Sequence, residues 1–188
     1  EPSRNGASLA VQHQLPLPPP RMSARRTRIP DLPTGRPDSD RPSAAGPVET
    51  AAGLVRGVVR LLHGLGYSTL TEMRLNSGRR VDVAGLDRRA RFAVVEIKTT
   101  RADFRADRKW RDYLPHCDQF FFAVPAGFPL SLLPEECGVI VADRYQGEVL
   151  RPGPKRPMTG AARRQQTLLF AHIAAHRLDR SLSGPLRS

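Results

Sequence analysis

Two short runs of almost unbroken apolar residues constrain the fold of this chain more than any other feature. They are Gln119–Val124 and Gly138–Ala142, and a proline-interrupted loop joins them. Strands that are covered on one face alternate apolar and polar residues, whereas strands that are apolar at nearly every position are covered on both faces. The sequence therefore predicts an α/β domain in which helices flank a sheet.

Further elements are expected around these two runs. Leu54, Val58 and Leu62 recur at helical spacing, and Gly64 ends that helix. The other predicted elements are strands at about 69–75, 80–86 and 92–98, a second helix over 103–113 with Asp103 as its N-cap, and a last helix over 161–179. The predicted order is α-β-β-β-α-β-β-α, and the sheet is expected to be mixed.

Composition divides the chain into three parts. Residues 1–47 contain 10 of the 18 prolines and no apolar period, so we expect this segment to be disordered and dispensable for folding. Residues 48–150 hold the predicted core. Residues 151–188 form a linker and the last helix, with eight basic residues and one acidic residue. This net charge of +7, out of +12 for the chain, favours a polyanion such as nucleic acid as partner. The alternative is an Arg-rich composition without that role.

The cysteines and the apolar segments indicate a cytoplasmic protein. Cys117 and Cys137 form no Cys-x-x-Cys pair, and the sequence has no recognisable signal peptide, so we expect free thiols in a reducing compartment. The longest apolar region, 120–142, is interrupted by prolines, which argues against a membrane-spanning helix. The first residue is not a methionine, and Met22 is an alternative start.

Three charged residues lie on predicted strands where charge is costly. Asp82 is on the strand 80–86, and Glu96 and Lys98 are on the otherwise apolar strand 92–98. Side chains alternate along a strand, so Glu96 and Lys98 point to the same side, and the tight turn between the strands brings Asp82 close to them. Two carboxylates held together repel each other unless a cation lies between them, which favours Mg²⁺ or Mn²⁺. The alternative is a structural Glu–Lys pair on a surface strand.

Four stretches of the chain also resemble a known family. They are 72–82, 94–100, 103–113 and 117–125, and the run Asp103-Phe-Arg-Ala-Asp-Arg-Lys-Trp110 is the most specific of them. Over about residues 48–180 the chain is similar to MmcB-type DNA repair proteins, a family of the PD-(D/E)xK nuclease superfamily. The resemblance implies a restriction-endonuclease-like fold and a role in bacterial DNA repair. Val81 stands where the superfamily name places a proline, a position that varies among members.

Two further acidic residues are candidate metal ligands. Glu72, on the first predicted strand, could add a ligand to the site, with a purely structural role as the equal alternative. Glu49 begins the first predicted helix, where related nucleases often carry a metal-binding glutamate. For Glu49 we prefer stabilisation of the helix N-terminus by the negative charge.

Candidate DNA contacts come from the second predicted helix and the segment before it. They are Arg101, Arg105, Arg108, Lys109 and Tyr113. Lys109 and Tyr113 are four residues apart and would share one helix face. The alternatives are that the cations are simply solvated and that Tyr113 belongs to the core. His172 and His176 have helical metal-ligand spacing, but no glutamate follows His172 as in a zinc protease, so we interpret them as ordinary helix residues.

The functional hypothesis is a Mg²⁺- or Mn²⁺-dependent DNA endonuclease that acts in repair. The metal would polarise a phosphodiester, and Lys98 would orient or deprotonate the attacking water. The alternatives are a non-catalytic nucleic-acid-binding module of a repair complex and an RNA-processing nuclease on the same fold. DNA and other repair proteins are the expected partners, and the absence of a Walker-type loop implies no ATP. The sequence does not predict the DNA structure that is cut or the oligomeric state.

Overall fold

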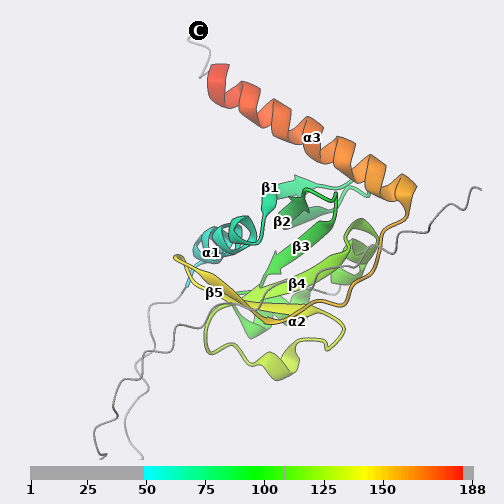
Figure 1. The fold of residues 1–188 in the computed structure, drawn as a ribbon. Helices are drawn as coiled ribbons and strands as arrows, with labels where there is room; N and C mark the ends of the chain where they lie inside the picture. The colour runs from blue at the N-terminus through cyan, green and yellow to red at the C-terminus, as the bar shows by residue number, and fades with distance from the viewer. Residues whose placement is uncertain (1–48, 108, 184–188) are drawn as a thin grey trace, which may run out of the picture. The chain divides into compact units, whose positions relative to one another are not determined.

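A six-stranded mixed sheet forms the centre of the chain (Figure 1). The computed structural model describes residues 49–107 and 109–183. Residues 1–47, which we expect to be disordered, lie outside this range. The elements, in chain order, are α1 (Ala51–Gly64), β1 (Tyr67–Arg74), β2 (Arg80–Asp87), β3 (Phe92–Ile97), α2 (Arg101–Ala106), the 3-10 helix η1 (Trp110–His116), β4 (Gln119–Val124), a short 3-10 turn η2 (Leu130–Leu132), β5 (Gly138–Ala142), β6 (Gly147–Arg151) and α3 (Gly160–Ser183).

The strands follow one another across the sheet in the order in which they occur in the sequence. β1, β2 and β3 form an antiparallel meander, β3, β4 and β5 are parallel, and β6 returns antiparallel to β5. Tight turns allow the meander, with Gly78 at φ +81° before β2 and a turn closed by Ala90 N and Asp87 O after it. The predicted fold class, an α/β domain with a mixed sheet flanked by helices, is confirmed.

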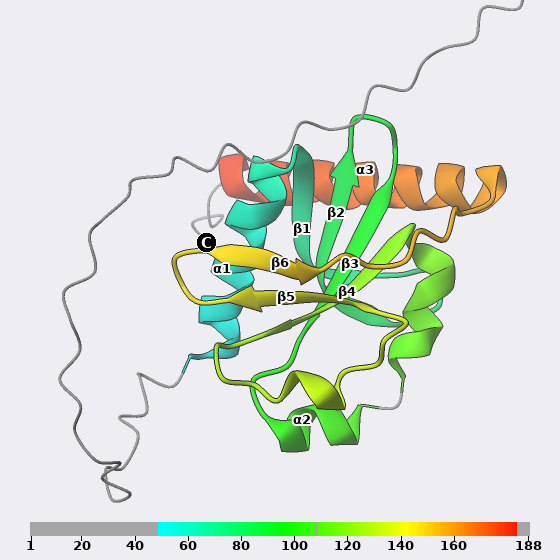
Figure 2. The same ribbon diagram turned by 60° about the horizontal axis from the view of Figure 1, so that its bottom comes forward.

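Helices cover both faces of the sheet, as the apolar runs in β4 and β5 require (Figure 2). On one face, Leu54, Val58 and Leu62 of α1 pack on alternate side chains of β2 to β5. The other face is covered by η1 and α3, where Trp110 stacks on Phe120 with ring centroids 5.6 Å apart. Within the described residues, no helix is both long enough and apolar enough to cross a membrane.

The second predicted helix is two elements in the structure. α2 ends at Ala106, and the chain leaves the helical conformation at Asp107, which has φ −88° and ψ 102°. The Asp107 carboxylate accepts a hydrogen bond from the backbone N–H of Lys109 at 2.9 Å, a local turn that competes with continuation of the helix. Thr100, rather than the predicted Asp103, is the N-cap of α2.

The sequence does not predict β6, which adds one strand to the expected order. Its residues alternate between half-buried and exposed, and it pairs only with β5. A short edge strand with this pattern carries little apolar signal, because one side makes no ladder and one face is solvated. Arg151, which we placed at the start of the linker, is the last residue of β6.

Candidate functional site

The antiparallel ladder between β2 and β3 stops just before the predicted acidic residues. The last paired residues are Val83 and Val95. Beyond this point, the side chain of Asp82 replaces its backbone as the hydrogen-bond partner of β3. Its Oδ2 accepts a hydrogen bond from the backbone N–H of Ile97 at 2.8 Å. β2 and β3 therefore separate at Asp82, and its carboxylate fills the position of a ladder partner.

β2 and the adjacent β1 are both irregular at the level of Asp82. Val81 packs in the core under η1 and α3, whereas Val83, two residues later, packs in the core under α1. Residues two apart in a regular strand share a face, so the chain must twist at Asp82. On the adjacent β1, Glu72 has φ +49°, a conformation that non-glycine residues rarely adopt. The local irregularity opens a space at the edge of the two cores.

Glu96 is the most constrained carboxylate at this opening. It is 5% exposed, and within the described chain its Oε1 is buried without a hydrogen-bond partner. Burial, together with the negative charge of Asp82, raises the pKa of Glu96 to about 8, and Lys98 offsets only part of this shift. Burial also raises the pKa of Asp82, against the opposing effects of the Ile97 N–H and of Lys98. In the folded chain the Asp82 and Glu96 carboxylates therefore repel each other, and Glu96 is incompletely hydrogen-bonded.

Lys98 is buried beside these carboxylates but is paired with two others. Its Nζ lies 2.8 Å from Oδ2 of Asp107 and 3.9 Å from Oδ1 of Asp103. Burial alone would lower the pKa of Lys98, but the hydrogen bond to Asp107 and the negative charges of Asp107, Asp103 and Glu96 together outweigh burial, so the pKa is raised and the amine stays charged. The two aspartates come from the start of α2 and from the turn that ends it.

A pocket of about 520 Å³ brings the predicted catalytic residues together. Asp82, Glu96 and Lys98 line one side, and the first turns of α1 form the other. Asp103 and Glu72 lie at the same pocket. The three residues predicted from the sequence therefore converge on one pocket, although Asp82 comes from β2 and the other two from the end of β3 and the residue after it.

The donor set in this pocket fits a hard divalent cation. Asp82 and Glu96 supply two carboxylates, and Mg²⁺ is commonly bound by one or two carboxylates with water and phosphate oxygens completing the shell. The unpartnered buried Oε1 of Glu96 is an acceptor that a cation would satisfy. Among residues 49–107 and 109–183, no group of three or more His, Cys, Asp or Glu side chains has a metal-binding arrangement. A cation here would therefore depend on two protein carboxylates.

The other predicted acidic ligands have partners elsewhere. Glu72 lines the pocket, but its carboxylate forms an ion pair with Arg80 at 2.6 Å and is half exposed. Glu49 lies just before Thr50, the N-cap of α1, and its carboxylate is 3.6 Å from Arg144. Glu49 does not line the pocket.

The predicted DNA-contacting residues separate into two groups. Arg101 and Arg105 are exposed on α2, and Lys109 is exposed just before η1. Tyr113 is buried in the core, and its hydroxyl donates to the backbone O of Arg80 at 3.2 Å. Lys109 is the N-cap of η1, and a 3-10 helix has three residues per turn, so residues four apart do not share a face: Lys109 is exposed and Tyr113 is buried. Arg108 lies outside the described residues.

Asp107 is the site residue that the sequence reasoning missed. We interpreted the segment as one helix and assigned no role to Asp107. The signal was present in the run Asp103-Phe-Arg-Ala-Asp107, because two acids four residues apart follow soon after the strand that was predicted to carry Lys98.

His172 and His176 contact each other on the exposed side of α3, with 3.1 Å between their Nε2 atoms, and do not approach the pocket.

Comparison with known proteins connects this geometry to a family. A family model described as "DNA repair protein MmcB-like" matches residues 39–183, a span that includes every described element. The chain belongs to the MmcB-like DNA repair protein family. A solved structure of a protein of unknown function from Silicibacter pomeroyi is 42% identical and superimposes with a TM-score of 0.67. That match covers 70% of this chain and 90% of the other. No curated protein matches the sequence.

Membership of the MmcB-like family supports DNA repair as the role and DNA as the molecule involved. It makes the basic C-terminal segment relevant, and the structure divides that segment into two classes. The first class makes structural contacts by donating hydrogen bonds to backbone oxygens of the core: Arg151, Arg156, Arg163 and Arg177. Arg163 also donates to the carboxylate of Asp118. Lys155, Arg164 and Arg180 are exposed. Only the second class is suited to testing an electrostatic role without disturbing the fold.

We expect the triple substitution of Lys155, Arg164 and Arg180 to Gln to weaken non-specific DNA binding. Each phosphate contact that is lost should reduce the slope of log affinity against log salt by about 0.9, so the total reduction should lie between roughly 1 and 3. Fluorescence anisotropy over a range of NaCl concentrations measures the slope. An unchanged slope with unchanged affinity would exclude these three residues from the DNA surface.

Proposed function

We propose that this protein is a metal-dependent nuclease of the PD-(D/E)xK type that hydrolyses phosphodiester bonds of DNA during repair. One observation carries the proposal: the buried Oε1 of Glu96 has no hydrogen-bond partner in the described chain and lies beside Asp82 and Lys98 at one pocket. A buried acceptor that is not satisfied costs about 1–3 kcal/mol. Such an unsatisfied acceptor is explained when a bound ligand satisfies it, and a divalent cation is a ligand of suitable charge.

Each residue of the set has a distinct role in the proposed reaction. Asp82 and Glu96 would hold Mg²⁺ or Mn²⁺, and the hydrogen bond from Ile97 N orients Asp82 for this purpose. When bound, the cation supplies Lewis-acid stabilisation of the phosphodiester and a lower pKa for bound water. Lys98 holds a proton on Nζ and is close enough to the carboxylates to orient the attacking water or to stabilise the developing negative charge.

The ion pair of Lys98 with Asp107 supports one further role. In the absence of DNA, Asp107 and Asp103 neutralise the buried amine. They also fix its position just after β3, at the pocket that Glu96 lines. We therefore assign Asp107 as a positioning residue that aligns Lys98.

The same ion pair favours a second candidate function. If Asp107 and Asp103 hold Lys98 away from the phosphodiester when DNA is bound, the amine does not serve the reaction, and the protein would bind DNA without cutting it. This non-catalytic module shares the fold, the family and the DNA partner with the nuclease. The two candidates differ only in whether phosphodiester bonds are broken.

A cleavage screen distinguishes them. Single-stranded, nicked, flapped, branched and duplex DNA, with matched RNA, are incubated with the full chain in Mg²⁺ or Mn²⁺. We expect cleavage of at least one DNA substrate and its loss by a factor of 10² or more in Lys98→Ala, as is typical of removal of one acid–base or charge-stabilising group. Asp107→Asn should reduce kcat more than KM and shift the pH profile, because the Lys98 pKa falls when its partner loses its charge.

Arg79→Gln is a matched control for these variants, since it breaks the exposed ion pair with Asp112 and should leave cleavage unchanged. Binding of DNA without cleavage across the whole screen would favour the non-catalytic module. Preferential cleavage of RNA would favour the RNA-processing alternative.

A further inference from the structure

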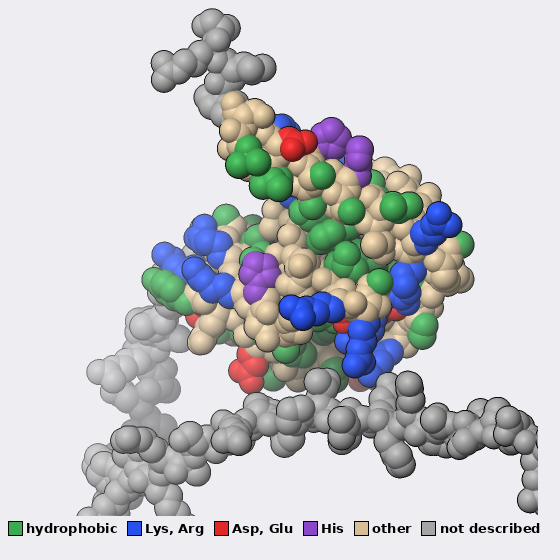
Figure 3. All heavy atoms as spheres, turned by 45° about the horizontal axis from the view of Figure 1, so that its top comes forward, with side chains coloured by type: hydrophobic (Ala, Val, Ile, Leu, Met, Phe, Trp, Pro, Cys, Tyr) green, Lys and Arg blue, Asp and Glu red, His purple; other side chains and the backbone are tan. Residues whose placement is uncertain are grey.

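We propose that the exposed side of α3 pairs with α3 of a second copy of this chain, in an antiparallel arrangement. α3 runs from Gly160 to Ser183 and is much longer than its contact with the core requires. Figure 3 shows hydrophobic side chains along its outer side, together with histidine and acidic side chains. This surface is separate from the pocket and does not depend on the nuclease assignment.

The side of α3 that faces the core is defined by its contacts. Gln166 and Phe170 are buried, and Phe170 packs edge-on against Phe92 with centroids 6.1 Å apart. Arg163 and Arg177 extend this side to the two ends of the contact. With Ile173, which packs against the same core, these positions recur at three- or four-residue spacing, so they form one stripe along the helix.

A second apolar stripe lies on the opposite side of α3. It consists of Leu168, Ala171, Ala175, Leu178 and Leu182, and every member is exposed. The leucines are 62%, 58% and 76% exposed. Their alternating spacing of three and four residues is the a/d pattern of a helix that packs against another helix. Between Leu168 and Leu182 the stripe contains no lysine or arginine, and Arg164 continues its spacing at the N-terminal end.

The order of large and small residues in this stripe favours an antiparallel second copy. In an antiparallel pair, a positions of one helix lie opposite d positions of the other. One register places Ala175 opposite Leu178 and Ala171 opposite Leu182, and the two-fold axis repeats both contacts. Leu178 and Leu182 then each meet an alanine, so these side chains interdigitate at close approach. A C2 interface of this kind is self-complementary and closes as a dimer.

A polar pair at the edge of the stripe independently supports the same register. His172 and Asp179 are exposed at the edge of the stripe, and Asp179 is the one acidic residue of residues 151–188. In the antiparallel register, His172 of each copy lies beside Asp179 of the other. In the single chain the His172 ring contacts His176, and dimer formation exchanges this contact for a hydrogen bond between the His172 ring and the Asp179 carboxylate of the other copy.

The oligomeric state tests the proposal directly. Sedimentation velocity of the full chain over micromolar concentrations should detect a dimer, and Leu178→Lys should weaken it roughly tenfold or more, because the substitution desolvates a charge within the seam. Leu65→Lys is the matched control, since Leu65 is 56% exposed at the end of α1 and should have no effect. A monomer at every concentration would overturn the proposal. An equal effect of both substitutions would also overturn it.

Charge exchange and cross-linking test the antiparallel register. His172→Glu should weaken the dimer, and adding Asp179→Lys to it should restore association. Protein with Ala171→Cys should cross-link to protein with Leu182→Cys when the two are mixed, and neither should cross-link efficiently alone. Cys117 and Cys137 are buried, which keeps the background low. Failure of the charge rescue together with cross-linking within each single variant would overturn the antiparallel arrangement.

Discussion

We expect Glu96→Gln to flatten the pH dependence of stability of the metal-free protein and to abolish metal-dependent DNA cleavage. The pKa of Glu96 is about 8 in the folded chain and close to 4.5 when the chain is unfolded. Between these values the unfolded state releases a proton that the folded state retains, so the stability of the parent protein falls as pH rises from about 4.5 to 8. A shift of this size corresponds to several kcal/mol at most, at about 1.4 kcal/mol per unit.

The variant lacks this titration. At pH 8 it should therefore be as stable as the parent or more stable, by as much as several degrees in Tm. Thermal melts at pH 5 and pH 8 in buffer with a chelator measure the effect. Glu148→Gln, an exposed substitution on β6, is the control and should leave the pH dependence unchanged.

Addition of Mg²⁺ should separate the parent from the variant. A ligand that binds only the folded state stabilises it by RT ln(1 + [L]/Kd), so the melting temperature of the parent should rise with Mg²⁺ concentration. Glu96→Gln and Asp82→Asn should show little response. Strong destabilisation by Glu96→Gln without metal, with no effect of Mg²⁺ on the parent, would instead identify Glu96 and Lys98 as a structural pair, and the nuclease proposal would fail.

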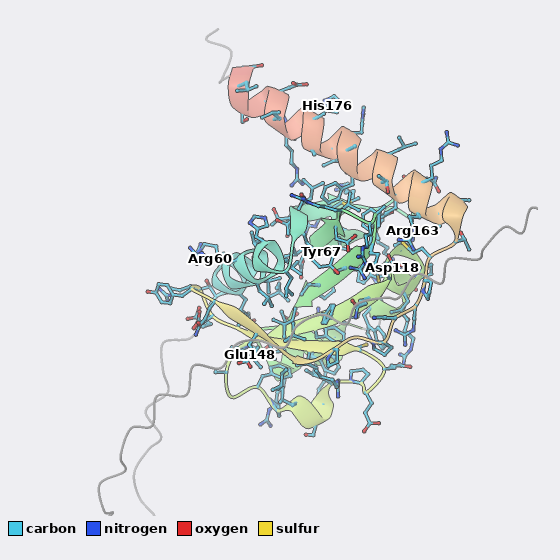
Figure 4. The ribbon with its side chains drawn as sticks, viewed as in Figure 1. Arg60, Tyr67, Asp118, Glu148, Arg163 and His176 are labelled. Carbon is cyan, nitrogen blue, oxygen red and sulfur yellow. The ribbon has the colours of Figure 1, made fainter. Side chains whose placement is uncertain are left out.

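The largest loss of stability is expected from Asp118→Ala. Asp118 is 9% exposed and accepts two hydrogen bonds from the Arg163 guanidinium, at 2.7 and 2.8 Å (Figure 4). The same carboxylate accepts from the backbone N–H of Phe92 at 2.7 Å and of Met158 at 3.3 Å. Removing it leaves a partly buried cation and a buried N–H unpaired, which typically costs about 3–5 kcal/mol. Chemical denaturation should measure a decrease of that order in the free energy of unfolding.

Two comparisons test this assignment. Asp112→Ala removes an exposed ion pair with Arg79 and should cost less than about 1 kcal/mol. Burial raises the pKa of Asp118, but the hydrogen bonds from Arg163 and the backbone outweigh burial, so the net pKa is lowered. The stabilisation is therefore present above the unfolded pKa and is lost as pH falls through the folded value. Equal losses in Asp118→Ala and Asp112→Ala would show that Asp118 does not anchor α3.

Much of the fold could be predicted from local patterns. β4 and β5 were predicted with the observed bounds, because fully covered strands are apolar at almost every position and differ clearly from their neighbours. The first helix and the meander were also predicted, with ends that differ by a few residues. β6 was missed because its half-exposed residues carry no comparable signal.

The convergence of Asp82, Glu96 and Lys98 on one pocket was predictable from the sequence. Glu96 on β3 and Lys98 directly after it are two residues apart, so the alternation of side chains along a strand predicts that both face the pocket. The position of Asp82 followed from the short connection between β2 and β3. These inferences need only the covalent chain and its nearest neighbours.

Only the tertiary structure determined the pKa values at the site and the ion pair that fixes Lys98. The pairing of Lys98 with Asp107 depends on the break after α2, which a helical pattern over 103–113 conceals. The raised pKa of Glu96 depends on burial by segments distant in sequence. Likewise, Arg163 became a structural residue only because α3 docks on Asp118. Residue types and spacing are encoded locally, whereas burial and ion-pair choice depend on which distant segments exclude water from each charge.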